Sequence, residues 1–332
     1  MQLSRREYVL GMGVLCLGGN RAMASDAPMS AQRLLKAADV HPNGYPTVEA
    51  VRWMSDRLDK ETNGRIRIHV YQSGQLGREP DTVDLARLGA LDITRVNFAA
   101  LNNPFPLTRL FSLPYVFDSV EHMRRSVDGE VGRAVLEGFS TRDLVGLAIY
   151  DAGSRCFYNV RHPVASPKDL HGLKLRVPGS DIFIEFVRAL GANPTPLPVN
   201  EVYSALQTHL IDGAENNWRT FHSSRQFEVA RYWSQSEHSY SPEALLMSRR
   251  NFDALTPSDR ELVVAIAKES VPYMRGLWDR MAAESKNAVI DAGVQVIEVN
   301  RAPFRDAVQP VLKKYLQHGD LEKLYAAVRA VA

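Results

Sequence analysis

The chain has 332 residues, and its 40 Lys and Arg nearly balance its 38 Asp and Glu. That balance excludes a protein that binds nucleic acid or an anionic membrane through a strong positive charge, so we expect no nucleic-acid partner. The length favours two domains, and two cysteines are too few for a disulfide framework.

Residues 1–24 have the composition of a bacterial export signal. Arg5 and Arg6 precede a short apolar run at 8–17, and an A-x-A cleavage site ends at Ala24. The apolar run is too short for a membrane anchor, which needs about 20 residues. We therefore expect cleavage after about Ala24 and a periplasmic mature protein. The paired arginines fit the twin-arginine route, but the sequence leaves the general secretory route open.

Beyond this leader, the sequence alternates between helical and strand patterns. Apolar residues at helical spacing predict helices at 47–62, 81–88, 180–191 and 200–209, the last two capped by Ser180 and Asn200. Apolar runs, alternating or continuous, predict strands at 66–70, 91–96, 144–150, 173–177 and 210–211. This order of elements predicts an α/β architecture with mainly parallel sheets.

The C-terminal third opens with a strong helix start. Thr256 is a capping residue, and Pro257 suits the first helical position. The helical pattern then continues to Ala292, which is about 35 residues against a usual length of about 11, with Pro272 expected to kink it. Such a helix does not fit within one small domain, so we expect it to run along two lobes. Because no linker separates the lobes, the chain should cross between them more than once.

Motifs for enzymatic chemistry are missing. The sequence has no GxSxG, phosphate-binding loop, HExxH or CxxC pattern, and its nine histidines lack the spacing of metal ligands. Removal of the leader leaves Cys156 as a lone thiol, which fits a small buried side chain better than a nucleophile. We therefore expect no enzyme, no cofactor and no metal site.

Three polar segments, at 151–158, 174–178 and 211–218, follow or end predicted strands. Ligands of open parallel sheets bind beyond the carboxyl ends of the strands. Arginine matches a carboxylate with a planar fork of donors, and asparagine offers both a donor and an acceptor. Arg176 is therefore a candidate for carboxylate binding, although an arginine at a strand end is more often a solvated surface charge.

Six motifs stand in a fixed order along the chain: QLG at 75–77, SLPYVF at 112–117, GLKLRVP at 172–178, LGANP at 190–194, EVYSALQT at 201–208 and DGAEN at 212–216. This set resembles the signature of the solute receptors of TRAP (tripartite ATP-independent periplasmic) transporters. The resemblance covers essentially the whole mature chain. It implies a two-lobed periplasmic binding protein fold with several crossings between the lobes and a long helix spanning both. Lobe I would comprise 25–152 plus about 241–280, and lobe II 153–240 plus about 281–332.

The resemblance also implies a set of ligand-binding residues. Arg176 matches the family arginine that pairs with the ligand carboxylate, Asn216 matches the asparagine that supports it, and Arg155 matches a second ligand-contacting arginine. Polar contacts from the first lobe would come from Glu79 and, at the mouth of that lobe, from His41, Arg95 and Asn97.

Within the family, His41-Pro42 with Tyr45-Pro46-Thr47, and GAENNW at 213–218, resemble a branch that includes hexuronate receptors. The chain departs from many members at 199–200, where they carry an aromatic residue before the EVY motif. The expected ligand is a sugar acid, a hexuronate such as glucuronate or galacturonate, delivered to integral membrane permease subunits.

The alternative ligand is a C4-dicarboxylate or another organic acid. Two other classes of protein remain as less favoured alternatives, an exported enzyme acting on an organic acid and a sensor subunit with the same binding fold. Turnover assays would identify the enzyme, and permease genes beside this one would separate a receptor from a sensor.

Overall fold

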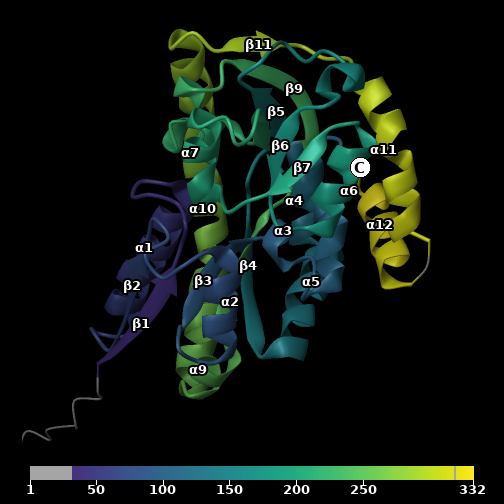
Figure 1. Cartoon of the computed structure of the whole chain (residues 1–332). Coiled ribbons are helices and arrows are strands. Elements are labelled where there is room, and N and C mark those ends of the chain that lie inside the picture. The colour runs from purple at the N-terminus through teal and green to yellow at the C-terminus, as the bar shows by residue number, and fades with distance from the viewer. Residues whose placement is uncertain (1–31, 318) are drawn as a thin grey trace, which may run out of the picture. The chain divides into compact units, whose positions relative to one another are not determined.

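The computed structural model describes residues 32–317 and 319–332, which form a five-stranded and a six-stranded sheet with helices around them (Figure 1). The expected leader and its cleavage site lie outside the described residues. Residues 32–332 form one compact unit, in which the chain passes repeatedly from one sheet to the other. Within the described part of the chain, no helix is both long enough and apolar enough to cross a membrane.

The five-stranded sheet has the order β2-β1-β3-β10-β4. Its strands are β1 (Arg33–Ala38), β2 (Ile66–Tyr71), β3 (Ile93–Asn97), β4 (Leu144–Tyr150) and β10 (Glu243–Ser248). β1 is parallel to β2 and β3, whereas β10 is antiparallel to β3 and β4. The helices of this part are α1 (Pro46–Glu61), α2 (Glu79–Arg87), α3 (Phe98–Leu101), α4 (Val120–Asp128), α5 (Glu130–Gly138) and α9 (Arg249–Asp253).

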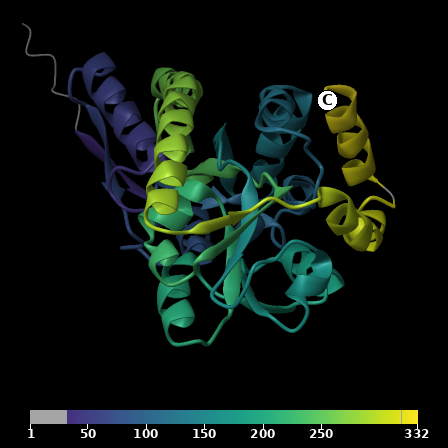
Figure 2. The ribbon, with the colours of Figure 1, turned by 90° about the horizontal axis from the view of Figure 1, so that it is seen from above.

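The six-stranded sheet has the order β11-β9-β5-β8-β6-β7. Its strands are β5 (Arg155–Asn159), β6 (Lys174–Val177), β7 (Asn193–Pro196), β8 (Gly213–Asn216), β9 (Tyr232–Ser239) and β11 (Gln295–Ile297). The helices that accompany it are α6 (Asp181–Ala189), α7 (Val202–Gln207), α8 (Trp218–Ser223), α11 (Arg301–Tyr315) and α12 (Asp320–Ala330). α11 contacts α6, and α12 contacts α5, on the side of the molecule away from α1 (Figure 2).

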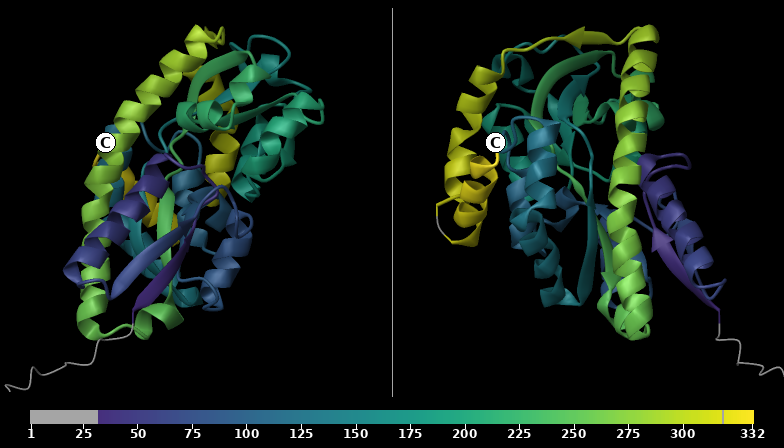
Figure 3. Two further views of the ribbon diagram at one scale, coloured as in Figure 1. Left: turned by 90° about the vertical axis from the view of Figure 1, so that its left-hand side faces the viewer. Right: turned by 180° about the vertical axis from the view of Figure 1, so that it is seen from behind.

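A single long helix, α10 (Pro257–Asp291), runs beside both sheets (Figure 3). It packs on α1 and β4 of the first sheet and on α8 of the second. The Thr256 side chain accepts a hydrogen bond from the Asp259 amide, as the start signal predicts. Pro272 lies inside the helix without ending it. The prediction of a helix that spans both halves is confirmed.

The prediction of mainly parallel sheets is confirmed for strand direction, although each sheet is mixed: among the described residues, β10 in the first sheet and β5 in the second run against the other strands. The chain leaves the first sheet after β4, enters the second with β5, and returns through β9 and β10. These two crossings run in opposite directions, so β4 is antiparallel to β10 and β5 is antiparallel to β9. α10 makes a third crossing. Hydrophobic patterns show where a strand lies but not its direction.

Some predicted boundaries also need correction. The strand expected at 210–211 lies at 213–216 instead, and the sequence patterns did not predict β1, β5, β7, β9, β10 or β11. Asn200 does not cap a helix, because it lies within a 3₁₀ turn, Val199–Glu201, ahead of α7. The predicted lobe boundaries, at 152–153 and 240–241, fall at the two strand crossings. A division into lobes that move as units stays a prediction.

Candidate ligand-binding site

Two adjoining cavities, of about 370 and about 30 Å³, lie where the two sheets face each other. Both are lined by Val40, Glu79, Arg176, Pro178 and Val199. The carboxyl ends of β3, β6 and β8 reach this point, together with the amino ends of the antiparallel β5 and β10. The combined volume of the two cavities falls in the usual range for small-molecule sites, roughly 300–1,000 Å³.

Arg176 stands in the wall that the six-stranded sheet contributes. It lies on β6, is 5 % exposed, and donates from Nε to the Leu197 carbonyl at 2.8 Å. Among the described residues, no carboxylate lies within ion-pairing distance of its guanidinium. Burial lowers the pKa of Arg176, Glu215 opposes this, and the charge of Arg155 lowers it further. Arg176 therefore holds a buried positive charge that the described residues do not neutralise by direct contact.

Arg155, on β5, lines the smaller cavity but is already paired with an acid. Its Nη2 donates to Glu215 Oε1 at 2.7 Å and to the Glu215 carbonyl at 3.0 Å. Burial would lower the pKa of Arg155, but Glu215 raises it overall. Its Nη1 reaches Asn216 Oδ1 at 3.1 Å. Arg155 thus orients Asn216 as well as facing the cavity.

Asn216 ends β8 beside Arg155 and Arg176. Its Oδ1 accepts from Arg155 and, at 2.9 Å, from the Asn217 amide. Those two bonds fix the orientation of the side chain and leave Nδ2 as the donor toward the cavity. The six-stranded sheet therefore presents nitrogen donors and positive charge to the space between the sheets.

The wall from the five-stranded sheet has the opposite character. Arg95, on β3, is 1 % exposed, and its guanidinium binds Asp39, Glu79 and Glu243. Its Nη1 lies 2.8 Å from Glu79 Oε1 and 3.0 Å from Glu243 Oε2. Three carboxylates surround one arginine, so their negative charge exceeds its positive charge. His41 Nε2 lies 3.7 Å from Glu243 Oε1.

Glu79 and Glu243 are the members of this cluster that line the cavity. Burial raises the pKa of Glu79, while Arg95 opposes that change. Burial would also raise the pKa of Glu243, but Arg95 and His41 hold it below its ordinary value. Glu243 Oε2 pairs with Arg95 at 3.0 Å but makes no hydrogen bond of good geometry with the described residues. Both acids therefore bring carboxylate oxygens, which are acceptors, to the lining of the cavity.

The remaining candidates are placed differently. His41 lines the smaller cavity and stacks on Tyr45 with 3.7 Å between ring centroids. Asn97 also lines it, but its Oδ1 caps α3 by accepting from the Ala99 amide at 3.0 Å. Arg95 does not line either cavity and stands behind Glu79.

Sequence reasoning missed two acidic residues of the site. Asp39 follows β1 and Glu243 begins β10, and neither strand was predicted. Thr220, which also lines the smaller cavity, was missed too; its hydroxyl lies 2.9 Å from the Tyr45 hydroxyl and joins the two halves. No motif marks these positions, and only the folded chain brings 39, 95 and 243 together.

Two mixed sheets joined by three crossings, with a charged cavity between them, define a protein that encloses a small polar solute. Bacterial extracellular solute-binding proteins of family 7, the DctP family, match residues 37–318 of the chain. The chain belongs to this family, and its relatives include TRAP transporter receptors. The resemblance seen in the sequence motifs is thereby confirmed.

Individual relatives agree with this assignment. A TRAP periplasmic solute binding protein from Xanthobacter autotrophicus, with bound β-D-galacturonate, is 45% identical with a TM-score of 0.87, covering 89% of this chain and 99% of that one. One from Roseobacter denitrificans, with bound β-D-glucuronate, is 37% identical with a TM-score of 0.87, covering 90% and 99%. A solute-binding protein from Chromohalobacter salexigens is 34% identical over 293 residues, 88% of this chain and 87% of its own length.

Proposed function

We propose that this TRAP solute receptor captures a hexuronate, such as galacturonate or glucuronate, between its two sheets. The observation that carries the proposal is the charge on the two cavity walls. Arg176, which no carboxylate of the described residues contacts, lies on one wall, and the acceptors Glu79 and Glu243 lie on the other. A molecule with a carboxylate at one end and hydroxyls at the other complements both walls. The uronates bound to two of the relatives have this form.

The carboxylate would bind to the wall of the six-stranded sheet. Arg176 offers its two Nη groups as a bidentate fork, because its Nε is used by the Leu197 carbonyl. Asn216 Nδ2 adds a donor whose position Arg155 fixes. Binding would neutralise the buried charge of Arg176.

The sugar hydroxyls would bind to the opposite wall. Hydroxyl groups donate to carboxylates, so Glu79 and Glu243 act as acceptors, with His41 beside them. Arg95 acts as a positioning residue, because it contacts both acids and lies outside the cavity lining. This wall disfavours a C4-dicarboxylate, because its second carboxylate would meet like charge.

The family is one of receptors and not of enzymes. We extend the proposal to the partner and the location: the receptor acts in the periplasm, after cleavage near Ala24, and delivers its ligand to the membrane permease of a TRAP transporter. Support comes from the sequence of the leader and from periplasmic relatives. Export by the twin-arginine or the general route can be separated by testing secretion of an Arg5→Lys, Arg6→Lys variant.

Glu79→Gln should change the ranking of sugar acids without preventing carboxylate binding. The substitution removes an acceptor for hydroxyls, whereas the carboxylate contacts at Arg176 remain. We expect the preference for galacturonate over a deoxy analogue to fall by roughly 10-fold or more, since a site built for hydroxyls otherwise leaves buried groups unpaired. A competition panel measures this. An equal change in affinity for every ligand would contradict the proposed division of roles between the two cavity walls. Glu137→Gln, at an exposed site outside both cavities, is the matched control.

Ligand should also draw the two sheets together. Tyr45 and Thr220 already bond across them at 2.9 Å, and a bound hexuronate would add contacts to both walls. We expect small-angle scattering to give a smaller radius of gyration with saturating galacturonate than without it. An unchanged scattering curve at saturation would contradict closure around the ligand.

A further inference from the structure

The two cavities of the ligand-binding site differ in the chemistry of the residues that line only one of them. Those that line only the smaller cavity are all polar or charged: His41, Asn97, Arg155, Asn216, Thr220 and Glu243. Most of those that line only the larger cavity are apolar: Pro80, Ala100, Gly179, Pro196, Leu197 and Pro198. The larger cavity therefore offers few partners for sugar hydroxyls and mainly hydrocarbon surface.

The polar groups of the larger cavity do not change this character. Its other two residues, Arg78 and Asn200, are exposed to solvent. The Arg78 guanidinium already binds the Asp81 carboxylate, from Nε at 2.9 Å and from Nη2 at 3.1 Å. The Leu197 carbonyl likewise accepts a hydrogen bond from Arg176 Nε. An apolar group is therefore a better occupant of the larger cavity than a second sugar ring, whose hydroxyls would lack partners there.

A single sugar ring does not fill the space between the sheets. The larger cavity alone has a volume of about 370 Å³. Sites of roughly 300–1,000 Å³ usually enclose drug-sized molecules, which are larger than one sugar ring. The polar partners of the ring lie in the smaller cavity or at its border with the larger one, where Arg176 and Glu79 line both. Room therefore remains beside a bound hexuronate.

The covalent structure of a hexuronate determines which of its atoms faces this room. The carboxylate and O1 flank the ring oxygen on one side of the sugar, and the hydroxyls on C2, C3 and C4 leave from the other side. When those hydroxyls contact Glu79 and Glu243, the carboxylate and O1 face the six-stranded sheet. The chain around that sheet contributes Gly179 and residues 196–198 to the larger cavity. A substituent on O1 would therefore extend along the apolar lining.

We propose that the receptor also binds hexuronides, in which O1 of the hexuronate carries an apolar group that occupies the larger cavity. This inference rests on the hexuronate proposal for the same site. The sugar acid keeps its contacts with Arg176 and with the two acids, and burial of the apolar group stabilises the complex further. The ligand class is thus a hexuronic acid linked through O1 to a phenol or an apolar alcohol.

Competition calorimetry on the mature protein tests the inference against galacturonate or glucuronate, whichever binds more tightly. The probes are the phenyl and the methyl β-hexuronide of that sugar, and the phenyl β-glycoside of the corresponding neutral sugar. We expect the phenyl hexuronide to bind at least about 5-fold more tightly than the methyl hexuronide, because both are substituted at O1 but only the phenyl group fills the larger cavity. The neutral glycoside, which lacks the carboxylate, should not displace the hexuronate.

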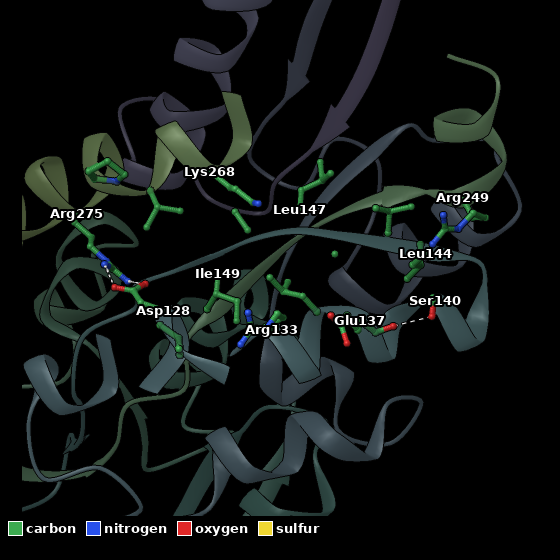
Figure 4. A pocket seen from close by; sticks show the side chains of 18 residues that line it. Asp128, Arg133, Glu137, Ser140, Leu144, Leu147, Ile149, Arg249, Lys268 and Arg275 are labelled. Atoms are coloured by element: carbon green, nitrogen blue, oxygen red, sulfur yellow. Dashed lines mark hydrogen bonds and ion pairs between the residues drawn. The ribbon is translucent and has the colours of Figure 1, made fainter. Parts of the chain in front are cut away.

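Phenyl binding elsewhere on the protein is separated by the competition format. A cavity of about 750 Å³ runs along β4, between α5 and α10, and shares no lining residue with the ligand-binding site (Figure 4). A phenyl group held in that cavity would not compete with a hexuronate. Phenol is the control for such binding, and it should not displace the hexuronate because it lacks the sugar acid.

Gly179→Leu should remove the preference for the phenyl over the methyl hexuronide. A Cβ at Gly179 would meet no atom within 4 Å, so a leucine side chain fits there and takes the space of the phenyl group. Gly276→Leu, at an exposed position on α10 that is equally free of neighbours within 4 Å, is the matched control and should keep the preference.

Two results would overturn the inference while leaving hexuronate binding in place. One is a methyl hexuronide that binds the wild type as tightly as the phenyl hexuronide, and the other is a preference that survives Gly179→Leu. Failure of every uronate to bind, free or substituted, would overturn the hexuronate proposal as well.

Discussion

Arg176→Met should strongly weaken sugar-acid binding while leaving the unliganded protein at least as stable as the wild type. Arg176 is buried and has no carboxylate in direct contact among the described residues. A buried charge without a partner is costly, and methionine has a similar length without the charge. We expect the affinity for galacturonate to fall by about 2–5 kcal/mol, as when one partner of a buried charge pair is removed.

Thermal unfolding with and without ligand measures both parts of this prediction. The wild type should gain about 2.7 kcal/mol of stability at 100 times its dissociation constant, and the variant should gain less than about 1 kcal/mol at the same ligand concentration. Arg188→Met, at an exposed arginine on α6, is the matched control and should behave as the wild type. A strong loss of stability in the unliganded Arg176→Met protein would contradict the prediction, because it would show that the wild-type protein stabilises the charge of Arg176 in the absence of ligand.

Arg95→Met should have the opposite consequence and destabilise the folded protein strongly. Arg95 is as buried as Arg176, but it holds Asp39, Glu79 and Glu243. Its removal leaves three carboxylates in one buried cluster without their shared arginine, so we expect a loss of about 3–5 kcal/mol at neutral pH. Chemical denaturation at pH 7 measures the loss.

The pH dependence of this loss distinguishes charge from packing. In the wild type, the pKa of Asp39 and that of Glu243 are held below their ordinary values of 3.8 and 4.5. At pH values above these ordinary pKa values, the ionised carboxylates therefore stabilise the folded protein. This stability is lost as the pH falls through the depressed pKa of each acid. In the variant, burial without Arg95 favours the protonated acids, so the deficit should shrink between pH 7 and pH 4. A deficit that is constant with pH would indicate lost packing instead.

Much of the architecture could be predicted because its signals are local. The cap at Thr256 and the stop after Ala292 delimit α10, and its length already requires two lobes. The apolar run at 144–150 coincides with β4. Arg176 and Asn216 lie within sequence motifs, so they could be named before the fold was known. The structure brings both to one cavity with Arg155.

The acidic wall could not be predicted, since its residues come together only through tertiary structure. Asp39, Arg95 and Glu243 lie on β1, β3 and β10 or just beyond them, and antiparallel pairing with β3 brings β10 into place. Arg95 was expected to contact the ligand. The sequence offered no sign that three acids would occupy its guanidinium. Partners of a buried charge depend on strand order, which apolar periodicity does not reveal.

Calorimetric titration of the mature wild-type protein with four related ligands tests the central claim most directly. D-Galacturonate and D-glucuronate carry the carboxylate and the hydroxyls, galacturonate methyl ester lacks the charge, and succinate lacks the hydroxyls. The opposed walls of Arg176 and of Glu79 with Glu243 predict that at least one hexuronate binds about 100-fold or more tightly than both the ester and succinate. Binding of the ester or of succinate as tight as that of either hexuronate would contradict the account.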